Sequence, residues 1–250
     1  MPSLKDIRIR IDSTKNTQQI TKAMKLVSAA KLRRAQHQIV NMRPYAATLL
    51  KMIADVSVTN RVSHPLMESP VETKKVLLVV LTSDRGLCGA FNANINRFAE
   101  TYHKENQSRF EKLDFLFIGR RGMDYFARRG IRPIDSILKL DKDVSYSLAS
   151  RVAERLMKDY LDGHYDEIRL IYNEFKSAIS QKVVSETLLP IDVSKSTFGQ
   201  DGALNSFSAD MIYEPSPEKI IDQMLVKAFS IQVYRCMCES VAAEHGARVS

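Results

Sequence analysis

A glycine-containing segment directly after the most apolar run of the chain holds the residues that could do chemistry. It spans Thr82–Asn92, reads TSDRGLCGAFN, and follows the apolar residues 76–81. A loop after the first strand of an α/β domain is where a nucleotide binds. The segment contains neither G-x-G-x-x-G nor G-x-x-x-x-G-K-[ST], however, and it offers no lysine for a phosphate. Nucleotide binding is therefore one interpretation among several.

Cys88 lies three residues after Arg85, whose positive charge would lower the pKa of a neighbouring thiol and make it a nucleophile. No histidine lies close in sequence to activate it, which weakens the hypothesis of a catalytic cysteine. Two other interpretations stay open. Gly86 and Gly89 permit a tight structural turn, and Arg85 can pair with carboxylates, which would make the loop a contact surface for an acidic partner protein.

The two other cysteines, Cys236 and Cys238, are predicted to have ordinary packing roles. Residues two apart on a helix point about 200° apart, so this pair cannot hold one metal ion. Three cysteines are also too few for a disulfide framework, and the five histidines show no metal-ligand spacing. The sequence therefore predicts no metal site.

The net charge of +8 is concentrated at the N-terminus. Residues 1–34 contain nine Lys and Arg but only two acids, Asp6 and Asp12. A local basic stripe implies a local acidic partner. Nucleic acid is disfavoured because binding it needs aromatic side chains for stacking, and the first aromatic residue is Tyr45. We therefore favour acidic protein loops as the partner, with a solvated helix face as the remaining alternative.

The composition, 44% hydrophobic and 26% charged, is that of a soluble protein. The longest apolar run, Val76–Leu81, is too short to span a bilayer. Lys5, Asp6 and Arg8 interrupt the stretch where a secretory signal would need an apolar core. We expect the protein to work where it is made, in the cytosol or on its membrane face.

The N-terminal residues 3–60 are predicted to form one helix of about 55 residues, roughly 80 Å long. Ser3 followed by Asp6 is typical of a capped helix start, and only Pro44 could bend the helix further on. Such a length exceeds the diameter of any domain that this chain could form. Much of the helix must therefore pack on something else.

Apolar residues in the second half of this helix alternate four and three apart, which is the seam of a coiled coil. Between Val27 and Ala35 the step is eight residues, with Lys31 in the gap, so we expect a phase slip there. The seam consists of Ala35, Ile39, Met42, Ala46, Leu49, Ile53 and Val56.

Ser216-Pro217-Glu218 is typical of a second helix start, with Ser as N-cap, Pro at the first position and an acid in the first turn. Two seamed terminal helices pair antiparallel if the middle folds as a compact insert. The alternative is two amphipathic helices of a globular bundle. The second seam consists of Ile221, Met224, Ala228, Ile231, Arg235, Cys238 and Ala242, and Arg235 is its one charged member.

The middle of the chain alternates predicted strands and helices, which indicates an α/β domain with a largely parallel sheet. Strands are predicted at 76–81, 114–119, 131–137, 167–175, 182–189 and 206–213; helices at 90–104, 121–129 and 147–161; and a loop at 190–203. The predicted fold class is α/β: an antiparallel coiled coil of the two terminal helices, 1–60 and 215–250, plus an inserted Rossmann-like α/β domain at 73–214.

Three segments together resemble the gamma subunit of the rotary, proton-driven ATP synthase. The first is KDIRIRIDSTKNTQQITKAMKLVSAAKLRRAQ, Lys5–Gln36, followed by Arg43–Ala46; the second is Thr82–Asn92; the third is Tyr213–Leu225 with Ser230–Arg248. Their order and separations match the family over nearly the whole chain. The resemblance is specific because it needs all three segments at once.

The resemblance implies a rotor rather than an enzyme. In this family the terminal helices stand as a shaft inside a ring of alternating alpha and beta subunits, and the α/β domain lies below, against the epsilon subunit and the membrane ring of c subunits. The catalytic residues belong to the beta subunits, so this chain should contribute no catalytic residue and no cofactor. The expected location is peripheral, on the cytoplasmic face of the bacterial plasma membrane, without membrane insertion and without nucleic acid.

The resemblance also implies which residues contact other subunits. Two sets match positions near the acidic lever segments of the beta subunits, one on the basic N-terminal helix and one in the Thr82–Asn92 loop; a third matches the C-terminal helix. They are Lys22, Met24 and Lys25; Arg85, Gly86, Cys88 and Gly89; and Arg235 and Glu239.

Two departures from the family pattern stand out. The given sequence stops at Ser250, whereas family members continue for a few dozen residues that form the tip of the shaft, which puts the contacts of the tip and the torque in doubt. Gly246 stands where alanine is expected, which weakens a helix by roughly 1 kcal/mol. The rival functions are a nucleotide-using α/β enzyme with a coiled-coil handle and a basic coiled-coil adaptor for nucleic acid.

Overall fold

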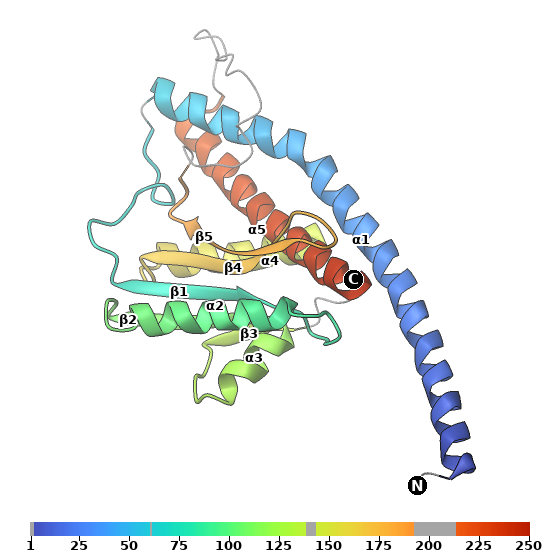
Figure 1. Ribbon diagram of the computed structural model, residues 1–250. Helices are drawn as coiled ribbons and strands as arrows, with labels where there is room; N and C mark the ends of the chain where they lie inside the picture. The colour runs from blue at the N-terminus through green and yellow to red at the C-terminus, as the bar shows by residue number, and fades with distance from the viewer. Residues whose placement is uncertain (1–2, 61, 139–143, 193–213) are drawn as a thin grey trace.

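Helix α1 (Leu4–Asn60) lies along one side of the molecule and extends beyond the rest of it at its N-terminal end (Figure 1). The computed structural model describes residues 3–60, 62–138, 144–192 and 214–250. The predicted cap is present, because the Ser3 nitrogen lies 3.0 Å from Asp6 Oδ2 and the Asp6 nitrogen 3.3 Å from Ser3 Oγ. With 57 residues and no break at Pro44, α1 is about 85 Å long.

A five-stranded sheet in the order β3-β2-β1-β4-β5 forms the centre of the α/β body. Strands β1 to β4 are parallel and only β5 is antiparallel, so the predicted largely parallel sheet is confirmed. The apolar run after Lys75 is the central strand, buried on both faces as parallel strands require. The strands are β1 (Lys75–Leu81), β2 (Lys112–Ile118), β3 (Asp135–Ile137), β4 (Glu167–Phe175) and β5 (Gln181–Leu189).

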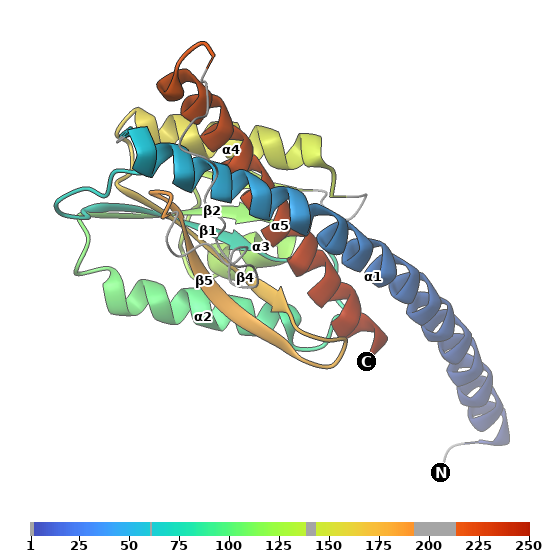
Figure 2. The ribbon, with the colours of Figure 1, turned by 90° about the horizontal axis from the view of Figure 1, so that it is seen from above.

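Helices cover both faces of this sheet and give two hydrophobic cores (Figure 2). Leu77, Val79 and Leu81 of β1 point to the core shared with α1, α4 and α5, whereas the alternate residues of β1 point to the core shared with α2 and α3. This three-layer arrangement is the predicted Rossmann-like domain. The helices are α2 (Phe91–Asn106), α3 (Arg120–Ala127), α4 (Tyr146–Leu161) and α5 (Pro217–Val249).

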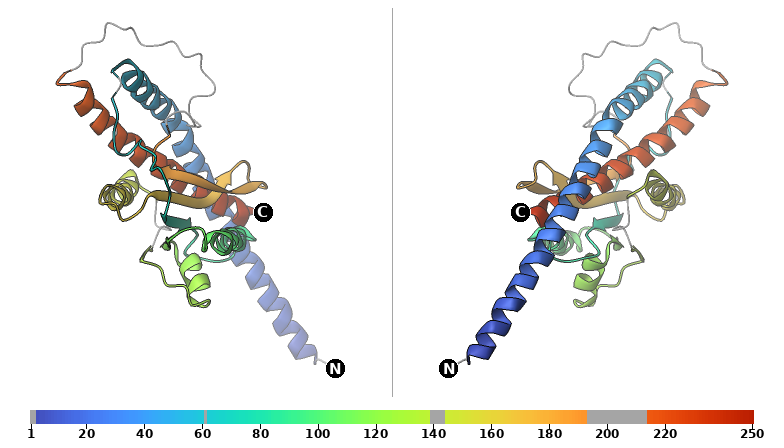
Figure 3. Two further views of the ribbon diagram at one scale, coloured as in Figure 1. Left: turned by 90° about the vertical axis from the view of Figure 1, so that its left-hand side faces the viewer. Right: turned by 90° about the vertical axis from the view of Figure 1, so that its right-hand side faces the viewer.

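The two terminal helices pair antiparallel, as predicted (Figure 3). Ala46 and Leu49 of α1 lie near Ala228 of α5, and Gln38 lies 3.9 Å from the Cys238 sulfur. The predicted seam is buried throughout except for the half-buried Met42. The N-cap of α5 is also as predicted, with Ser216 Oγ accepting the Lys219 N–H at 3.4 Å.

The predicted phase slip before Ala35 is wrong. Ser28 and Leu32 are buried and continue the four-three spacing up to Ala35, while Val27 is 58% exposed. The seam therefore includes a serine, Ser28, which a search for apolar residues alone does not find. Lys31 lies beside the seam rather than interrupting it.

Helix α5 is more than the second strand of a coiled coil. It packs against α1 on one side and against α4 and β4 on the other. Every residue from Arg235 to Ser240 is buried, which a helix with one buried face cannot achieve. Helix α5 therefore belongs to the α1/α5 pair and to the core of the α/β body at once.

Residues 4–27 of α1, called the basic arm below, extend past the end of α5 with no helix beside them (Figure 3). Ser28 is the first buried residue of α1, and the apolar residues of the arm are exposed, Leu4 by 79% and Ile20 by 61%. The basic residues of the arm are therefore exposed together with its isoleucines.

The other elements lie close to their predicted positions. The strand predicted at 131–137 is real only in its last three residues. The strand predicted at 206–213 and most of the loop predicted at 190–203 fall outside the described residues. Within the described part of the chain, no helix is long and apolar enough to cross a membrane.

The turn between β2 and α3 depends on Gly119. Its φ is +100°, and a Cβ there would lie 2.1 Å from the carbonyl oxygen of Thr82. Gly130 also has a positive φ, +77°, but nothing lies within 4 Å of its Cβ position.

Gly119→Ala should therefore lower the free energy of unfolding by about 3 kcal/mol or more, since it combines backbone strain with a clash against backbone. Gly130→Ala, which adds only the strain, should cost about 1–2 kcal/mol. Urea denaturation monitored by circular dichroism measures both. Equal losses would contradict the close approach of Gly119 to Thr82.

Candidate functional site

The β1 loop, residues 82–90, is held by side chains of its own segment. Asn92 Oδ1 accepts the Ser83 backbone N–H at 3.0 Å, and Asn92 Nδ2 donates to Ser83 Oγ at 2.8 Å. Ser83 Oγ in turn donates to the Arg85 carbonyl at 2.5 Å. These bonds fix the start of the loop before α2 begins. The tight-turn interpretation of the sequence is correct for this half of the loop.

Cys88 faces the interior of the loop rather than solvent. It is 2% exposed and lies 3.1 Å from Asn92 Nδ2. Burial raises the pKa of its thiol, against a smaller lowering by the hydrogen bond with Ser83. The hypothesis of a low-pKa thiol activated by Arg85 is therefore wrong, because a thiolate is disfavoured at a buried position.

The end of α5 occupies the position where a doubly wound sheet would bind a nucleotide. That position lies beyond the carboxyl ends of β1 and β4, where the strand order reverses. Ala243 and Ala247 of α5 pack into the core of Cys88 and Phe91 there, and Arg248 Nη2 donates to the Gly86 carbonyl at 3.3 Å. The crevice is therefore filled by the chain's own helix.

The outer half of the β1 loop is exposed and carries Arg85 and Leu87 at the surface. Leu87 is 78% exposed and has a φ of +59°, an unusual conformation for a bulky residue. A strained, solvent-facing apolar side chain next to an arginine is typical of a contact surface rather than of a core. Of the two glycines among the predicted contact residues of this loop, Gly89 is exposed and Gly86 is half-buried.

The β1 loop meets both terminal helices at a basic collar, formed by Lys31, Arg34, Arg85 and Arg248. These residues line a hollow of about 60 Å³ together with Glu244 and His245 of α5. Glu244 accepts a hydrogen bond from Arg248 of the same helix at 2.5 Å. Three elements distant in sequence thus place positive charge at the point where the basic arm leaves the body.

The basic arm carries the other predicted contact residues. Lys22 and Lys25 are exposed and Met24 is half-exposed, on the part of α1 that no other element covers. The structure does not bring them to the β1 loop, since Lys25 precedes the collar residue Lys31 by six positions of α1. The two predicted contact sets therefore lie at different positions along the length of α1.

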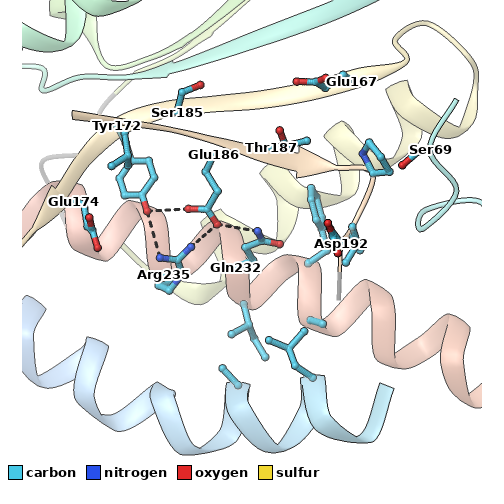
Figure 4. Close-up of a pocket in the computed structure, with 18 of the residues that line it drawn as sticks. Ser69, Glu167, Tyr172, Glu174, Ser185, Glu186, Thr187, Asp192, Gln232 and Arg235 are labelled. Atoms are coloured by element: carbon cyan, nitrogen blue, oxygen red, sulfur yellow. Dashed lines mark hydrogen bonds and ion pairs between the residues drawn. The ribbon is translucent and has the colours of Figure 1, made fainter. Parts of the chain in front are cut away.

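Arg235 and Glu239 differ from expectation, because both lie inside the molecule (Figure 4). Their side chains are 8% and 11% exposed and are bonded to each other at 3.1 Å. Arg235 also bonds Glu186 of β5 at 2.5 Å and Tyr172 of β4 at 3.2 Å. Contact of these two side chains with a separate subunit does not fit the structure, since partners within the chain already hold them.

These partners were not found by sequence reasoning. Glu186 and Tyr172 lie on predicted strands, and only a charged residue in the α5 seam, Arg235, signalled that a buried counter-charge was needed. They line a cavity of about 540 Å³ between β5, α5 and α1, with Gln232 donating to Glu186 at 2.9 Å. The described residues contain no group of three or more His, Cys, Asp or Glu that could hold a metal ion.

Comparison with known proteins decides what these surfaces belong to. The family model described as ATP synthase matches residues 3–250. The ATP synthase gamma chain of Bdellovibrio bacteriovorus is 67% identical over 251 residues, which cover 100% of this chain and 85% of the relative. The chain belongs to the ATP synthase gamma-chain family. The gamma chain of Chlorobium phaeobacteroides strain BS1 is 45% identical, again over 100% of this chain and 85% of the relative.

Solved structures agree with this family. A chain from the central stalk and c-ring of the Tetrahymena thermophila mitochondrial ATP synthase superimposes with a TM-score of 0.69 at 27% identity, covering 92% of this chain and 96% of that one. A chain from the rotor of the Euglena gracilis enzyme gives 0.61 at 19% identity, covering 97% and 86%, and supports the fold alone. Gamma chains are non-catalytic subunits of the central stalk, and neither the enzyme nor the nucleic-acid alternative is supported.

His245 in the collar of this gamma-family chain gives a pH-dependent stability. It is 7% exposed; burial, then the charges of Arg248 and Lys31, lower its pKa to about 4. In the unfolded chain its pKa is about 6.5, so between these values the unfolded state binds more protons. Stability from this group is present above about pH 6.5 and is lost as the pH falls.

His245→Gln should remove this dependence. Between pH 7 and pH 5, the free energy of unfolding of the unmodified chain should fall by about 1–2 kcal/mol relative to that of the variant. Glu244, whose pKa burial raises, is present in both proteins and cancels from the difference. Urea titrations at both pH values measure it, and His37→Gln on the exposed side of α1 is the control that should keep the slope. A pH-independent difference would show that His245 is not buried in its neutral form.

Proposed function

We propose that this chain is the rotating central shaft of an ATP synthase, which couples ion flow through the membrane ring to ATP synthesis or hydrolysis on the beta subunits. The observation that carries the proposal is the basic arm continuing out of an antiparallel helix pair that is itself anchored in an α/β body. An isolated protein gains nothing from an uncovered helix with exposed isoleucines. A helix that stands inside a ring of other subunits needs such a surface.

The charge of the arm suits a surface that makes and breaks contacts in every turn. Each exposed pair between a lysine of the arm and a carboxylate of a partner contributes only about 0–1 kcal/mol. Contacts of this size guide a neighbouring subunit without locking the rotor. We therefore assign Lys22 and Lys25 to contacts with the acidic lever segments of the beta subunits, and Met24 to an apolar contact with the same subunits.

The β1 loop is the second proposed contact with the beta subunits. Arg85 is a charged residue of this loop at the surface, and Leu87, which is also exposed, lies close to it in the sequence. Gly86 and Gly89 allow the loop its shape, since Gly89 has a φ of +53°. Cys88 is buried and contributes by packing the loop from inside. Arg235 and Glu239 are left out of the proposed contacts.

The end of the molecule opposite the basic arm is the proposed foot of the rotor, the part nearest the membrane. There the start of α5 and the end of α1 come together, joined by His64 and Asp222 at 3.3 Å (Figure 1). We infer that this end, with the α/β domain at 73–214, lies against the epsilon subunit and the c-ring, and that the chain is peripheral on the cytoplasmic face of the bacterial plasma membrane. The shaft then comprises 1–60 and 215–250.

The first test is assembly. The chain co-expressed with alpha, beta and epsilon subunits should co-purify with them and, on vesicles carrying the membrane sector, should make ATP hydrolysis drive ion pumping. The measurement is the pumping rate divided by the hydrolysis rate. A stable complex of alpha and beta subunits that excludes the chain would overturn the proposal.

A charge reversal tests the arm. Lys22→Glu with Lys25→Glu should lower the ratio of pumping to hydrolysis about threefold or more, because like charges would then face each other at every lever. The free energy of unfolding should change by less than about 0.5 kcal/mol, since both positions are exposed.

The matched control is the same reversal on the exposed face of α4, at Arg151 and Lys158. It changes the total charge equally and should leave the ratio unchanged. If the arm and α4 variants behave alike, the arm has no specific contact with acidic segments.

A further inference from the structure

A cluster of polar residues links the middle of α5 to the sheet. The Arg235 cluster consists of Arg235, Glu239 and Gln232 of α5, Tyr172 of β4 and Glu186 of β5 (Figure 4). One guanidinium reaches two strands, since it bonds Glu186 of β5 at 2.5 Å and the Tyr172 hydroxyl of β4 at 3.2 Å. The strands it reaches are neighbours in the sheet.

The cluster is closed by bonds among its members. Tyr172 donates to Glu186 Oε2 at 2.9 Å and lies 3.4 Å from Glu239 Oε2. Gln232 donates to Glu186 Oε1 at 2.9 Å, one turn before Arg235. Arg235 itself is 6% exposed, although it occupies a seam position where an apolar residue would pack. A buried charge at such a position is costly unless its partners stay in place.

Apart from hydrogen bonds at its C-terminal end, from Arg248 to Gly86 and from Ser250 to Ala178, the contacts of α5 with the body outside the cluster are mainly apolar. Apolar packing is non-directional, so a helix held by it alone can turn slightly with little loss. A turn of 20° about the axis of α5 would move a side-chain end by about 2 Å. The bonds of Arg235 to Glu186 and Tyr172, at 2.5 and 3.2 Å, would then be broken. The guanidinium fork therefore opposes rotation of α5 relative to the sheet.

We propose that Arg235 is a positioning residue that fixes the rotation of the shaft helix α5 relative to β4 and β5. Torque can then pass between the shaft and the α/β domain without a rotation of α5 against the sheet. The proposal rests on the rotor function proposed above. It assigns Arg235 a role inside the chain instead of a contact with another subunit. Glu186 is the partner chosen for the test, because its carboxylate ties the guanidinium to the sheet at 2.5 Å.

The two carboxylates of the cluster provide matched variants. Burial raises the pKa of Glu186, but the charge of Arg235 and the hydrogen bonds from Gln232, Arg235 and Tyr172 outweigh it and leave that pKa lowered. At Glu239 burial is stronger than the effect of Arg235, and the pKa is raised. Glu186→Gln thus removes the charge that holds Arg235 to another element, whereas Glu239→Gln changes chiefly the 3.1 Å bond to Arg235 within α5 and, besides it, only the longer 3.4 Å contact with Tyr172.

The experiment measures the torsional stiffness of the rotor in the assembled complex. Alpha and beta subunits with this chain are fixed to a surface and stalled, and a bead on the exposed end of α2 reports the angular fluctuations of the α/β domain. Glu186→Gln should at least double the variance of the angle. Glu239→Gln should leave it within error of the unmodified chain. Equal variances for Glu186→Gln and the unmodified chain would overturn the proposal.

A second variant separates stiffness from stability. Arg235→Met with Glu186→Leu replaces the ion pair by apolar side chains, which commonly restores or raises stability. This double variant should be at least as stable to urea as Glu186→Gln and should still show the doubled variance. Wild-type stiffness in the double variant would show that packing alone transmits torque. Val152→Ala in the core of α4, which destabilises without touching the cluster, should leave the variance unchanged.

The unmodified chain distinguishes the two proposals. If it fails to assemble and rotate, the rotor function is wrong and the torque role of Arg235 falls with it. If it rotates but the Glu186 variants stay stiff, only the role of Arg235 is wrong.

Discussion

The burial of α5 between α1 and the sheet is the constraint on which the rest of the structure depends. An ordinary amphipathic helix packs one face against its neighbours and exposes the other. Helix α5 is covered on two sides, and the residues from Arg235 to Ser240 are buried around its whole circumference. Its outward side carries α1, its inward side closes the core of β4 and α4, and its last turn closes the crevice beyond β1. Without α5 the long helix would lose its main packing partner, and the sheet would keep only α4 as cover on that face.

The close fit at the end of α5 explains a residue that sequence reasoning treated as a weakness. Gly246 lowers the helix propensity of the last turns, but a Cβ there would lie 3.2 Å from the carbonyl oxygen of Ala178 in the turn between β4 and β5. Ser250 Oγ donates to the same carbonyl at 3.1 Å. The glycine lets this turn approach the helix, so local propensity yields to tertiary packing.

Much of the architecture could be predicted from the sequence because it rests on local signals. Periodicity predicts the α1/α5 pair, alternating segments predict the parallel sheet, and caps such as Ser216 predict where helices begin. What could not be predicted depends on residues far apart in the sequence. Ser28 looks polar until its place in the seam is known. Arg235 and Glu239 look like surface contacts until Glu186, about 50 residues earlier in the chain, is seen beside them.

The pairing of the first helix with the last also determines when the protein can fold. The seam of α1 is complete once Asn60 has been made, but its partner begins only at Pro217. At bacterial rates of synthesis the interval lasts on the order of 10–30 s, far longer than helix formation. During that time a formed helix exposes an uncovered apolar seam next to the ribosome. The α/β strands must therefore fold before α5 can cover them, and the chain is most vulnerable to misassembly until the 33 residues of α5 emerge.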